Sequence, residues 1–388
     1  MTSADDRQPA HKPRLLRRVK RVVVKVGSNV LAGPTGLRAP RVRALARDIA
    51  ALVASGRQVV VVTSGAVAAG AARLGPRRTR LEWRQAAAAV GQPTVMAAWE
   101  RAFAAHDRQV AQVLLTHGDL SDRRRYLNAR HTLRTLLALG VVPIVNENDT
   151  VAVEELKFGD NDNLSALTAA LIEADLLVVL TDVAGLHTRD PRVDADAPLV
   201  PVARADEPML TRAAGAAGSA IGTGGMASKV AAARKAAAAG IPTVIADGTR
   251  AGIVGAVFDP GVEVGTLVLA DGDPLGRRKH WIAYTLEPAG TLTLDAGAER
   301  AVVQGGRSLL PSGVRRVDGS FGVGDCVRVV GPDGHECARG LVSYGAVELE
   351  RIKGAHTRDI ERLLGYKGSD EVIHRDDLVV VAPARASG

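Results

Sequence analysis

The chain has 388 residues, of which 46% are hydrophobic and 3% aromatic, and its formal net charge is +8. This length predicts two or three domains, and the apolar content excludes a chain that is disordered throughout. No segment reaches the roughly 18 uncharged apolar residues of a membrane span, and no long apolar run follows the basic N-terminal residues as in a secretory signal peptide. We therefore expect a cytoplasmic protein.

The positive charge is concentrated at the N-terminus. Seven Lys or Arg residues and only two Asp residues lie within positions 1–21, in a segment that is rich in polar residues and Pro. We expect residues 1–20 to form a disordered basic arm, so the net charge is a poor sign of nucleic-acid binding. The two cysteines, Cys326 and Cys337, flank His335, but a fourth zinc ligand and CxxC spacing are missing, and no metal held by the protein is expected.

Up to about residue 270, apolar β-branched runs alternate with amphipathic or Ala-rich segments. Helices are expected over Pro40–Ala54, Ala66–Leu74, Glu82–Ala105, Arg124–Leu139, Leu164–Glu173 and Ala227–Ala239. Strands are expected at Val22–Val26, Val59–Val62, Gln109–Leu115, Val141–Val145, Leu176–Leu180 and Thr243–Ala246, with shorter ones near Ile253–Phe258 and Thr266–Leu269. This alternation predicts an α/β fold, a three-layer αβα sandwich with an open, mainly parallel sheet, over residues 21–270.

The pattern changes after residue 270. Residues 271–287 are typical of a linker, and residues 288–382 contain short, turn-rich strands that predict a separate, small, β-rich domain. The pair Asp333-Gly334 between two such strands indicates a hairpin.

Chemistry is expected where the strands of the first domain end, because ligands of open α/β sheets collect at the carboxyl ends of strands. Lys25 interrupts an apolar strand that leads into Gly27, and Ser64 follows another apolar strand. A lysine, glycine amides and a hydroxyl suit an anion. The alternatives are a surface lysine and a simple helix N-cap.

Two polar clusters, NENDT at 146–150 and GDNDN at 159–163, flank a short stretch between an apolar strand and an apolar helix. They are typical either of turns and caps or of a pocket for a small zwitterion. Further on, IGTGGMASK at 221–229 satisfies neither the Walker A nor the GxGxxG spacing, but it offers flexible amides and the Lys229 cation to a polyphosphate.

Together these motifs give a specific resemblance. The chain closely resembles the glutamate 5-kinases of the amino-acid kinase family, in their long form with a C-terminal PUA domain, from Val22 to its end. The motifs in family order are VVKVGSNVL, VVTSGAVAAG, AVGQ, YLNAR, VPIVNENDTVA, FGDNDNLSA, LLTDVAGLHTRDP, IGTGGMASK and GYKGSDEVIHRDD. The N-terminal arm and His131, where Asp or Asn is expected, depart from the pattern.

The resemblance implies the amino-acid kinase fold and ATP-dependent phosphorylation of the γ-carboxylate of L-glutamate, the first step of proline biosynthesis. Lys25 and Lys229 would flank the transferring phosphoryl group, and Asp162 would orient both. Ser64, Asp149 and Asn161 would bind glutamate. ATP would be contacted by Lys25, Thr181, Asp182, Thr223, Gly224, Gly225, Met226, Ala227, Ser228 and Lys229. Mg²⁺ would accompany ATP, held mainly by phosphate oxygens and water.

The family also implies feedback inhibition by proline, a homodimer or homotetramer, and handover of the labile product to a glutamyl-phosphate reductase. Two alternatives stay open. The chain could be a sister kinase acting on another carboxylate, carbamate or nucleotide. The PUA resemblance also raises RNA binding, which the mixed charges and scarce aromatics of that domain disfavour.

Overall fold

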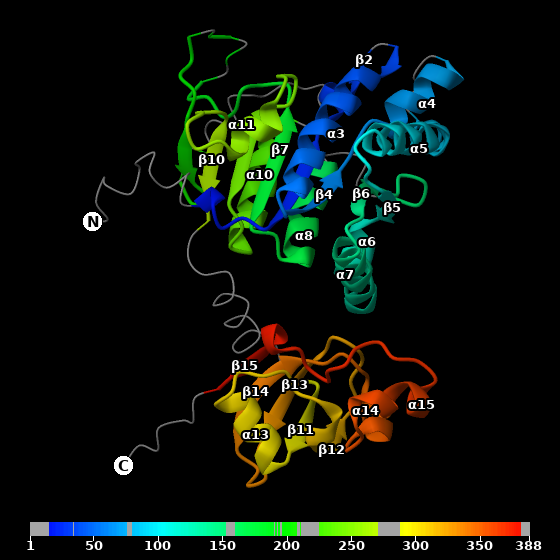
Figure 1. Ribbon diagram of the computed structural model, residues 1–388, viewed down its shortest axis with the longest axis vertical. Coiled ribbons are helices and arrows are strands. Elements are labelled where there is room, and N and C mark those ends of the chain that lie inside the picture. Colours follow the sequence, from blue (N-terminus) through cyan, green and yellow to red (C-terminus); the bar gives the residue numbers. More distant parts are fainter. Residues whose placement is uncertain are drawn as a thin grey trace, which may run out of the picture. The chain divides into compact units, whose positions relative to one another are not determined.

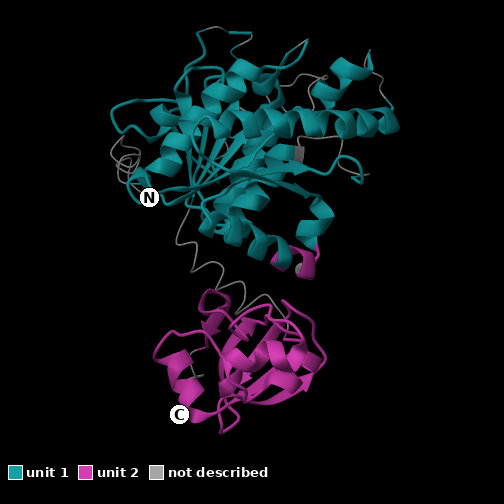
Figure 2. Ribbon diagram, turned by 45° about the vertical axis from the view of Figure 1, so that its right-hand side comes forward, with its two compact units in different colours: residues 1–121, 128–271 teal, residues 122–127, 272–388 magenta. Residues whose placement is uncertain are grey.

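The computed structural model describes residues 15–33, 35–75, 80–152, 160–189, 191, 193–194, 196–207, 210, 225–270 and 288–381. The chain divides into two compact units, residues 1–121 with 128–271 and residues 122–127 with 272–388 (Figure 2). The predicted linker, 271–287, lies outside the described residues. No helix of the described ranges combines the length and the apolar character that a membrane span requires.

The first unit is built on one large sheet, which within the described residues has eight strands (Figure 1). Their order is β5 (Val110–Leu115), β6 (Val142–Glu147), β4 (Gln58–Val62), β1 (Arg21–Val26), β7 (Leu176–Thr181), β9 (Thr243–Asp247), β10 (Thr266–Leu269) and β8 (Val202–Arg204). The six strands from β5 to β9 are parallel, and β10 runs antiparallel to β9. A two-stranded ribbon, β2 (Ala32–Gly33) and β3 (Gly36–Leu37), follows the short helix α2 (Ser28–Leu31).

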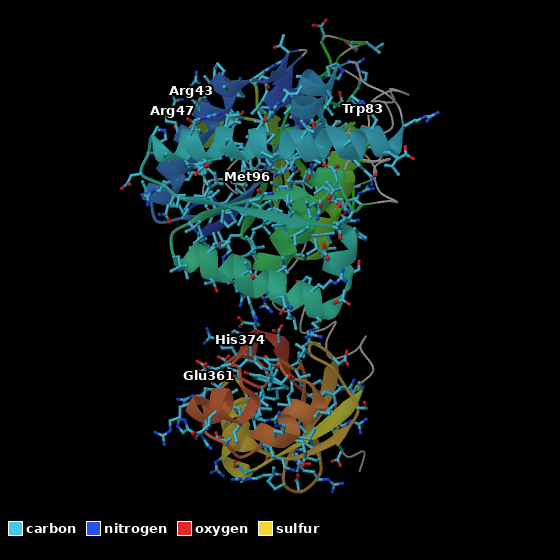
Figure 3. All side chains as sticks on the ribbon, turned by 90° about the vertical axis from the view of Figure 1, so that its right-hand side faces the viewer. Arg43, Arg47, Trp83, Met96, Glu361 and His374 are labelled. Atoms are coloured by element: carbon cyan, nitrogen blue, oxygen red, sulfur yellow. The ribbon has the colours of Figure 1, made fainter. Side chains whose placement is uncertain are left out.

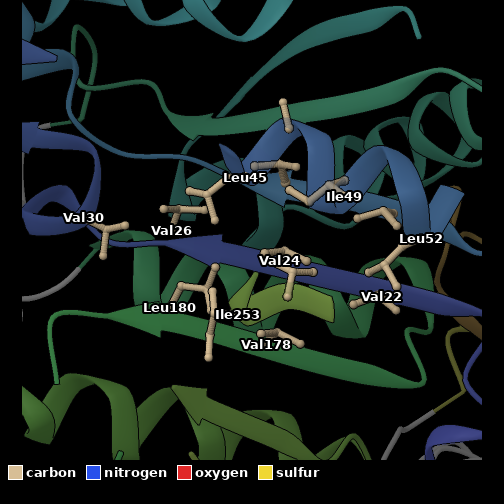
Figure 4. Close-up of a cluster of buried hydrophobic side chains, with 14 of the residues drawn as sticks. Val22, Val24, Val26, Val30, Leu45, Ile49, Leu52, Val178, Leu180 and Ile253 are labelled. Carbon is tan, nitrogen blue, oxygen red and sulfur yellow. The ribbon is translucent and has the colours of Figure 1, made fainter. Parts of the chain in front are cut away.

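Helices cover both faces of this sheet. One face carries α3 (Ala39–Ala54), α5 (Leu81–Ala104) and α11 (Ile253–Phe258), whose apolar side chains form one cluster with alternate residues of β1. Figure 4 shows the part of this cluster that joins β1 to α3 and α11. On α5, Met96 packs against this cluster (Figure 3). The helices α8 (Asp160–Ile172) and α10 (Met226–Ala238) pack together and contact strands of the sheet. The remaining described helices are α4 (Ala66–Leu74), α6 (His117–Ser121) and α7 (Arg123–Ala138).

The alternation along β1 places its one lysine. Val22, Val24 and Val26 belong to the apolar cluster with α3, α5 and α11. Successive side chains of a strand point to opposite faces. Lys25 therefore points to the other face, where it meets α8.

The second unit has its own core and a five-stranded sheet. Its order is β12 (Val314–Gly319), β11 (Gly290–Leu294), β13 (Cys326–Val330), β14 (Glu336–Leu341) and β15 (Leu378–Val380). The helices are α13 (Ala296–Val303), α14 (Ala346–Ile352) and α15 (Ile360–Leu364). The predicted hairpin joins β13 to β14, and Gly334 takes a left-handed φ of +83°, which glycine adopts without strain.

Three expectations need correction. Ile253–Phe258 is a helix rather than a strand, because Ile253, Val254 and Val257 have the helical spacing that buries one face. The helix expected from Leu164 begins at Asp160, so most of GDNDN forms a first helical turn rather than a preceding loop. Leu16 and Val19, within the predicted arm, are buried in the main apolar cluster, so the ordered domain begins before residue 21.

Candidate functional site

Three of the predicted site residues lie at the carboxyl ends of neighbouring parallel strands. Lys25, near the end of β1, pairs with Val62 of β4 on one side and Val179 of β7 on the other. Ser64 follows β4, and Thr181 is the last residue of β7. The central position of β1 explains how segments far apart in sequence converge.

Two lysines and one aspartate form a buried cluster, which we call the lysine cluster. Lys25 Nζ lies 2.5 Å from Asp162 Oδ1, and Lys229 Nζ lies 3.3 Å from Asp162 Oδ2. The three residues are 5%, 5% and 1% exposed. They come from β1, α10 and α8, so the tertiary fold alone brings the two ammonium groups to one carboxylate.

The electrostatics of the cluster favour an ionised carboxylate. Burial by itself raises the pKa of Asp162, but Lys25, Lys229 and the hydroxyl of Ser228, which donates to Oδ2 at 2.7 Å, outweigh it and lower the pKa below the ordinary value. Burial, with Lys25 adding to it, lowers the pKa of Lys229, while Asp162 opposes this shift. Two ammonium groups against one carboxylate leave a positive charge in excess, which an incoming anion can balance.

A second set of contacts joins Ser64 to Asn161. The Asn161 amide nitrogen donates to Ser64 Oγ at 3.1 Å, and its oxygen accepts from the backbone N–H of Glu147 at 3.3 Å. Gly65 follows with φ +100° and is the N-cap of α4. Ser64 is therefore no plain cap of that helix, since its hydroxyl bonds to α8 instead. Neutral donors and acceptors of this kind suit a polar substrate.

Asp149 lies in the turn after β6 and is half-buried. Burial raises its pKa to about 6, and the guanidinium of Arg84 on α5 lowers it in part. At neutral pH this carboxylate is ionised and poorly solvated. Such a group favours a cationic partner.

The residues expected to contact nucleotide are described in part. Asp182, exposed after β7, accepts from Asn29 at 2.8 Å and from the Thr181 hydroxyl at 3.1 Å. Its carboxylate is close enough to Lys229 to oppose the lowering of the Lys229 pKa by burial. Gly225 precedes α10, whose first residues are Met226, Ala227, Ser228 and Lys229. Thr223 and Gly224 lie outside the described residues.

Sequence reasoning missed several contacts around the site. It assigned Ser228 to the nucleotide and did not foresee its hydrogen bond to Asp162. It gave no role to Gln92 or Trp99, whose polar atoms bond to Asn146 and Thr63 next to the site. The available signal was their separation of seven residues on one predicted helix.

Comparison with known proteins agrees with this architecture. The model described as "Amino acid kinase family" matches residues 20–247, and the model described as "PUA domain" matches residues 290–364. Glutamate 5-kinases from Geobacter sp. (strain M21) and Pelobacter propionicus are 52% and 53% identical over 370 residues, which cover 95% of this chain and 99% of each relative. A glutamate 5-kinase from Myxococcus xanthus is 52% identical over 94% of this chain and 97% of its own length.

Among solved structures, a UMP kinase from Bacillus anthracis aligns with a TM-score of 0.46 at 19% identity, over 66% of this chain and 97% of that chain. The family is set instead by the relatives that match almost from end to end. The chain belongs to the amino acid kinase family, and within it to the glutamate 5-kinases.

Proposed function

We propose that this protein transfers the γ-phosphoryl group of ATP to the γ-carboxylate of L-glutamate, which gives L-glutamyl 5-phosphate in the first step of proline biosynthesis. The relatives that span nearly the whole chain are named glutamate 5-kinases. The observation in the molecule that carries the proposal is the lysine cluster, in which Lys25 and Lys229 meet at Asp162.

The reaction needs charge balance more than it needs a base. A carboxylate with a pKa near 4 is already ionised at pH 7 and attacks phosphorus without losing a proton. Its oxygen forms a bond to the γ-phosphorus while the bond to the β,γ-bridging oxygen breaks and ADP leaves. The obstacle is the approach of one anion to another, and fixed cations reduce it.

In this proposal Lys25 and Lys229 contact the transferring phosphoryl group from two sides, and Asp162 orients both. Asp162 is buried and its pKa is lowered, so it stays ionised when the phosphate leaves. Ser228 would keep the carboxylate in place through its hydrogen bond.

Glutamate, the phosphoryl acceptor, would be bound by residues outside the lysine cluster. The ionised Asp149 would pair with the α-ammonium group of glutamate, and Ser64 with Asn161 would hydrogen-bond its carboxylate groups. This favours an amino acid with a free amine over an acetylated amine or a nucleotide phosphate.

The nucleotide would lie against Thr181, Asp182 and the residues from Gly225 to Lys229, with Thr223 and Gly224 adding to the same loop. In the described ranges no group of three or more His, Cys, Asp or Glu side chains is arranged to hold a metal ion. Mg²⁺ would accompany ATP, bound chiefly by phosphate oxygens and water.

Trapping of the acyl phosphate tests the proposal. With ATP, Mg²⁺ and hydroxylamine, glutamate should yield its γ-hydroxamate, whereas aspartate and N-acetylglutamate should yield little. A clear preference for either of the other acids would replace the proposal with a sister kinase. L-Proline, the expected feedback inhibitor, should raise the KM for glutamate in the same assay.

The PUA match favours one second candidate, RNA binding by residues 290–364. Filter binding of the full chain to single-stranded RNA over a series of salt concentrations tests it. Phosphate-driven binding weakens steeply as salt rises. Retention no greater than that of an acidic control protein at low salt would reject this second function.

A further inference from the structure

The long helix α5 carries three polar side chains at intervals of seven residues. They are Gln85, Gln92 and Trp99, and we call them the α5 stripe. Seven residues are close to two helical turns, so the three side chains lie on one face of the helix. Each forms a hydrogen bond to a different segment around the acceptor side of the site.

The three hydrogen-bond partners of the α5 stripe come from the segments after β6 and β4 and from the end of β6. Gln85 Nε2 donates to the carbonyl oxygen of Ala152 at 3.2 Å. Gln92 Oε1 accepts from Asn146 Nδ2 at 2.8 Å. Trp99 Nε1 donates to Thr63 Oγ1 at 2.9 Å.

Each of these partners lies within three residues of Ser64 or Asp149, which are proposed to bind glutamate. Thr63 precedes Ser64, and Asn146 precedes Glu147, whose backbone N–H holds Asn161. Ala152 closes the segment that contains Asp149. Thr63 N–H also donates to the Val145 carbonyl at 2.8 Å, so the ends of β4 and β6 are tied together beside the α5 stripe.

The hydrogen bond between Trp99 and Thr63 is buried, and the bonds of Gln85 and Gln92 are partly buried. Trp99 and Thr63 are 0% exposed, and Asn146 is 1% exposed. A buried donor or acceptor that loses its partner has no water to replace it. The Trp99–Thr63 bond therefore fixes the end of β4 against α5 more sharply than apolar packing alone, and the two partly buried bonds add to this.

The backbone of α5 is held close to the same region. Gly91 precedes Gln92, and a Cβ atom on Gly91 would lie 1.9 Å from the carbonyl oxygen of Ala66. Ala66 is the first residue of α4 and comes two residues after Ser64. The missing side chain thus lets α5 rest directly on the segment that carries Ser64.

We propose that the α5 stripe positions the acceptor side of the site, setting the spacing between Ser64 and the segment that contains Asp149. Its members are positioning residues, because their bonds go to neighbours of the binding residues. The lysine cluster comes from β1, α8 and α10, and none of the three bonds reaches it. The identity of the acceptor, glutamate, rests on the proposed function.

Trp99→Phe, Thr63→Val and the double variant test the stripe by steady-state kinetics. Each single change should lower kcat/KM for glutamate by roughly three- to tenfold, with the KM for ATP within about twofold, because one buried hydrogen bond is lost. The double variant should be no worse than the poorer single variant, because both remove the same bond. Multiplying effects, or equal losses for both substrates, would overturn the role.

Met96→Leu is the matched control, since Met96 packs against the same apolar cluster from the same helix without belonging to the α5 stripe. It should leave both KM values unchanged. If Trp99→Phe fails to fold, Gln92→Met removes the acceptor of Asn146 with little change of volume and carries the same kinetic expectation. A loss with Met96→Leu as large as with the stripe variants would assign the effect to general packing.

Hydrogen exchange of the ligand-free protein decides the inference without any activity. Backbone amides in residues 142–152 should exchange faster in Gln92→Met and Trp99→Phe, and at the normal rate in Met96→Leu. Normal exchange in the stripe variants would overturn the positioning role. If the unaltered protein does not phosphorylate glutamate, the proposed function fails while the exchange result still decides the inference.

Discussion

The two sides of the site are held by different forces. The lysine cluster consists of ion pairs that converge on the 1% exposed carboxylate of Asp162. The acceptor side is held mostly by neutral hydrogen bonds, among them Asn161 to Ser64 and Trp99 to Thr63. Removing a buried charge leaves its partners uncompensated, whereas removing a neutral bond shifts a segment slightly. We therefore expect the first side to govern turnover and the second to govern substrate affinity.

The largest effect should come from the lysine cluster. Lys229→Ala should lower kcat by about 10³-fold or more, about 4 kcal/mol, because one of two cations at the transferring phosphoryl group is lost. Lys235→Ala is the control, since Lys235 is an exposed lysine on the same helix that donates to Asn163 at 2.5 Å. A coupled assay of ADP release should show a large loss of kcat in Lys229→Ala and a normal kcat in Lys235→Ala. Near-normal kcat in Lys229→Ala, with unchanged circular dichroism, would remove Lys229 from catalysis.

Asp149 should have a large effect on affinity and a distinct pH dependence. Its pKa of about 6 means that acid pH removes the counter-charge of the substrate ammonium. The KM for glutamate should rise as pH falls below 6, approaching tenfold per pH unit, while the KM for ATP should change little. Asp149→Asn should have a high KM, at least roughly tenfold above normal, without this pH dependence. A variant with the normal pH profile would contradict the pairing.

The ionised Asp149 should help substrate binding but lower the folding stability of the ligand-free protein. Burial raises its pKa from 3.8 to about 6, so folding disfavours the ionised form. The resulting destabilisation is present above pH 6 and is relieved as pH falls through 6 toward 3.8. Asp149→Asn should therefore be more stable than the unaltered protein at pH 7 and gain less on acidification, as measured by urea denaturation. Equal stability of both proteins at pH 7 would argue that Asp149 is stabilised by a partner in the ligand-free state.

Ser64→Ala should have a moderate effect. The change removes the hydroxyl that accepts from Asn161, so the KM for glutamate should rise roughly three- to tenfold with a smaller change in kcat. Ser55→Ala is a suitable control, because the Ser55 hydroxyl donates to the Leu52 carbonyl at the end of α3, opposite the strand ends that form the site. Comparable losses in the two variants would remove Ser64 from the substrate pocket.

The smallest effect is expected in the PUA domain. His335 hydrogen-bonds through Nδ1 to Asp333 Oδ1 at 2.5 Å, and this bond raises the pKa of His335 above 6.5. An NMR titration should show that pKa falling toward 6.5 in Asp333→Asn, with kinase activity unchanged. A matching change in the KM for glutamate would link this exposed hairpin to the catalytic domain.

Element positions in the catalytic domain were largely predictable from local pattern. The runs at Val22–Val26 and Leu176–Leu180 are rich in Val and Leu, and they form the central strands β1 and β7. Prediction failed where a short apolar segment fits the pattern of a strand as well as that of a helix. The segment Ile253–Phe258 is such a case, and its helical spacing is recognised only once Ile253, Val254 and Val257 are seen to be buried.

The sequence by itself determined the element types, the motifs and the candidate lysines, because those depend on residue chemistry and on spacing along the chain. The tertiary structure decided which atoms meet. Lys25 and Lys229 are joined through Asp162 only because the fold packs α8 against both β1 and α10, which are far apart along the chain. The α5 stripe likewise becomes visible only when its three partners are known, since a spacing of seven residues names a helix face but not what that face touches.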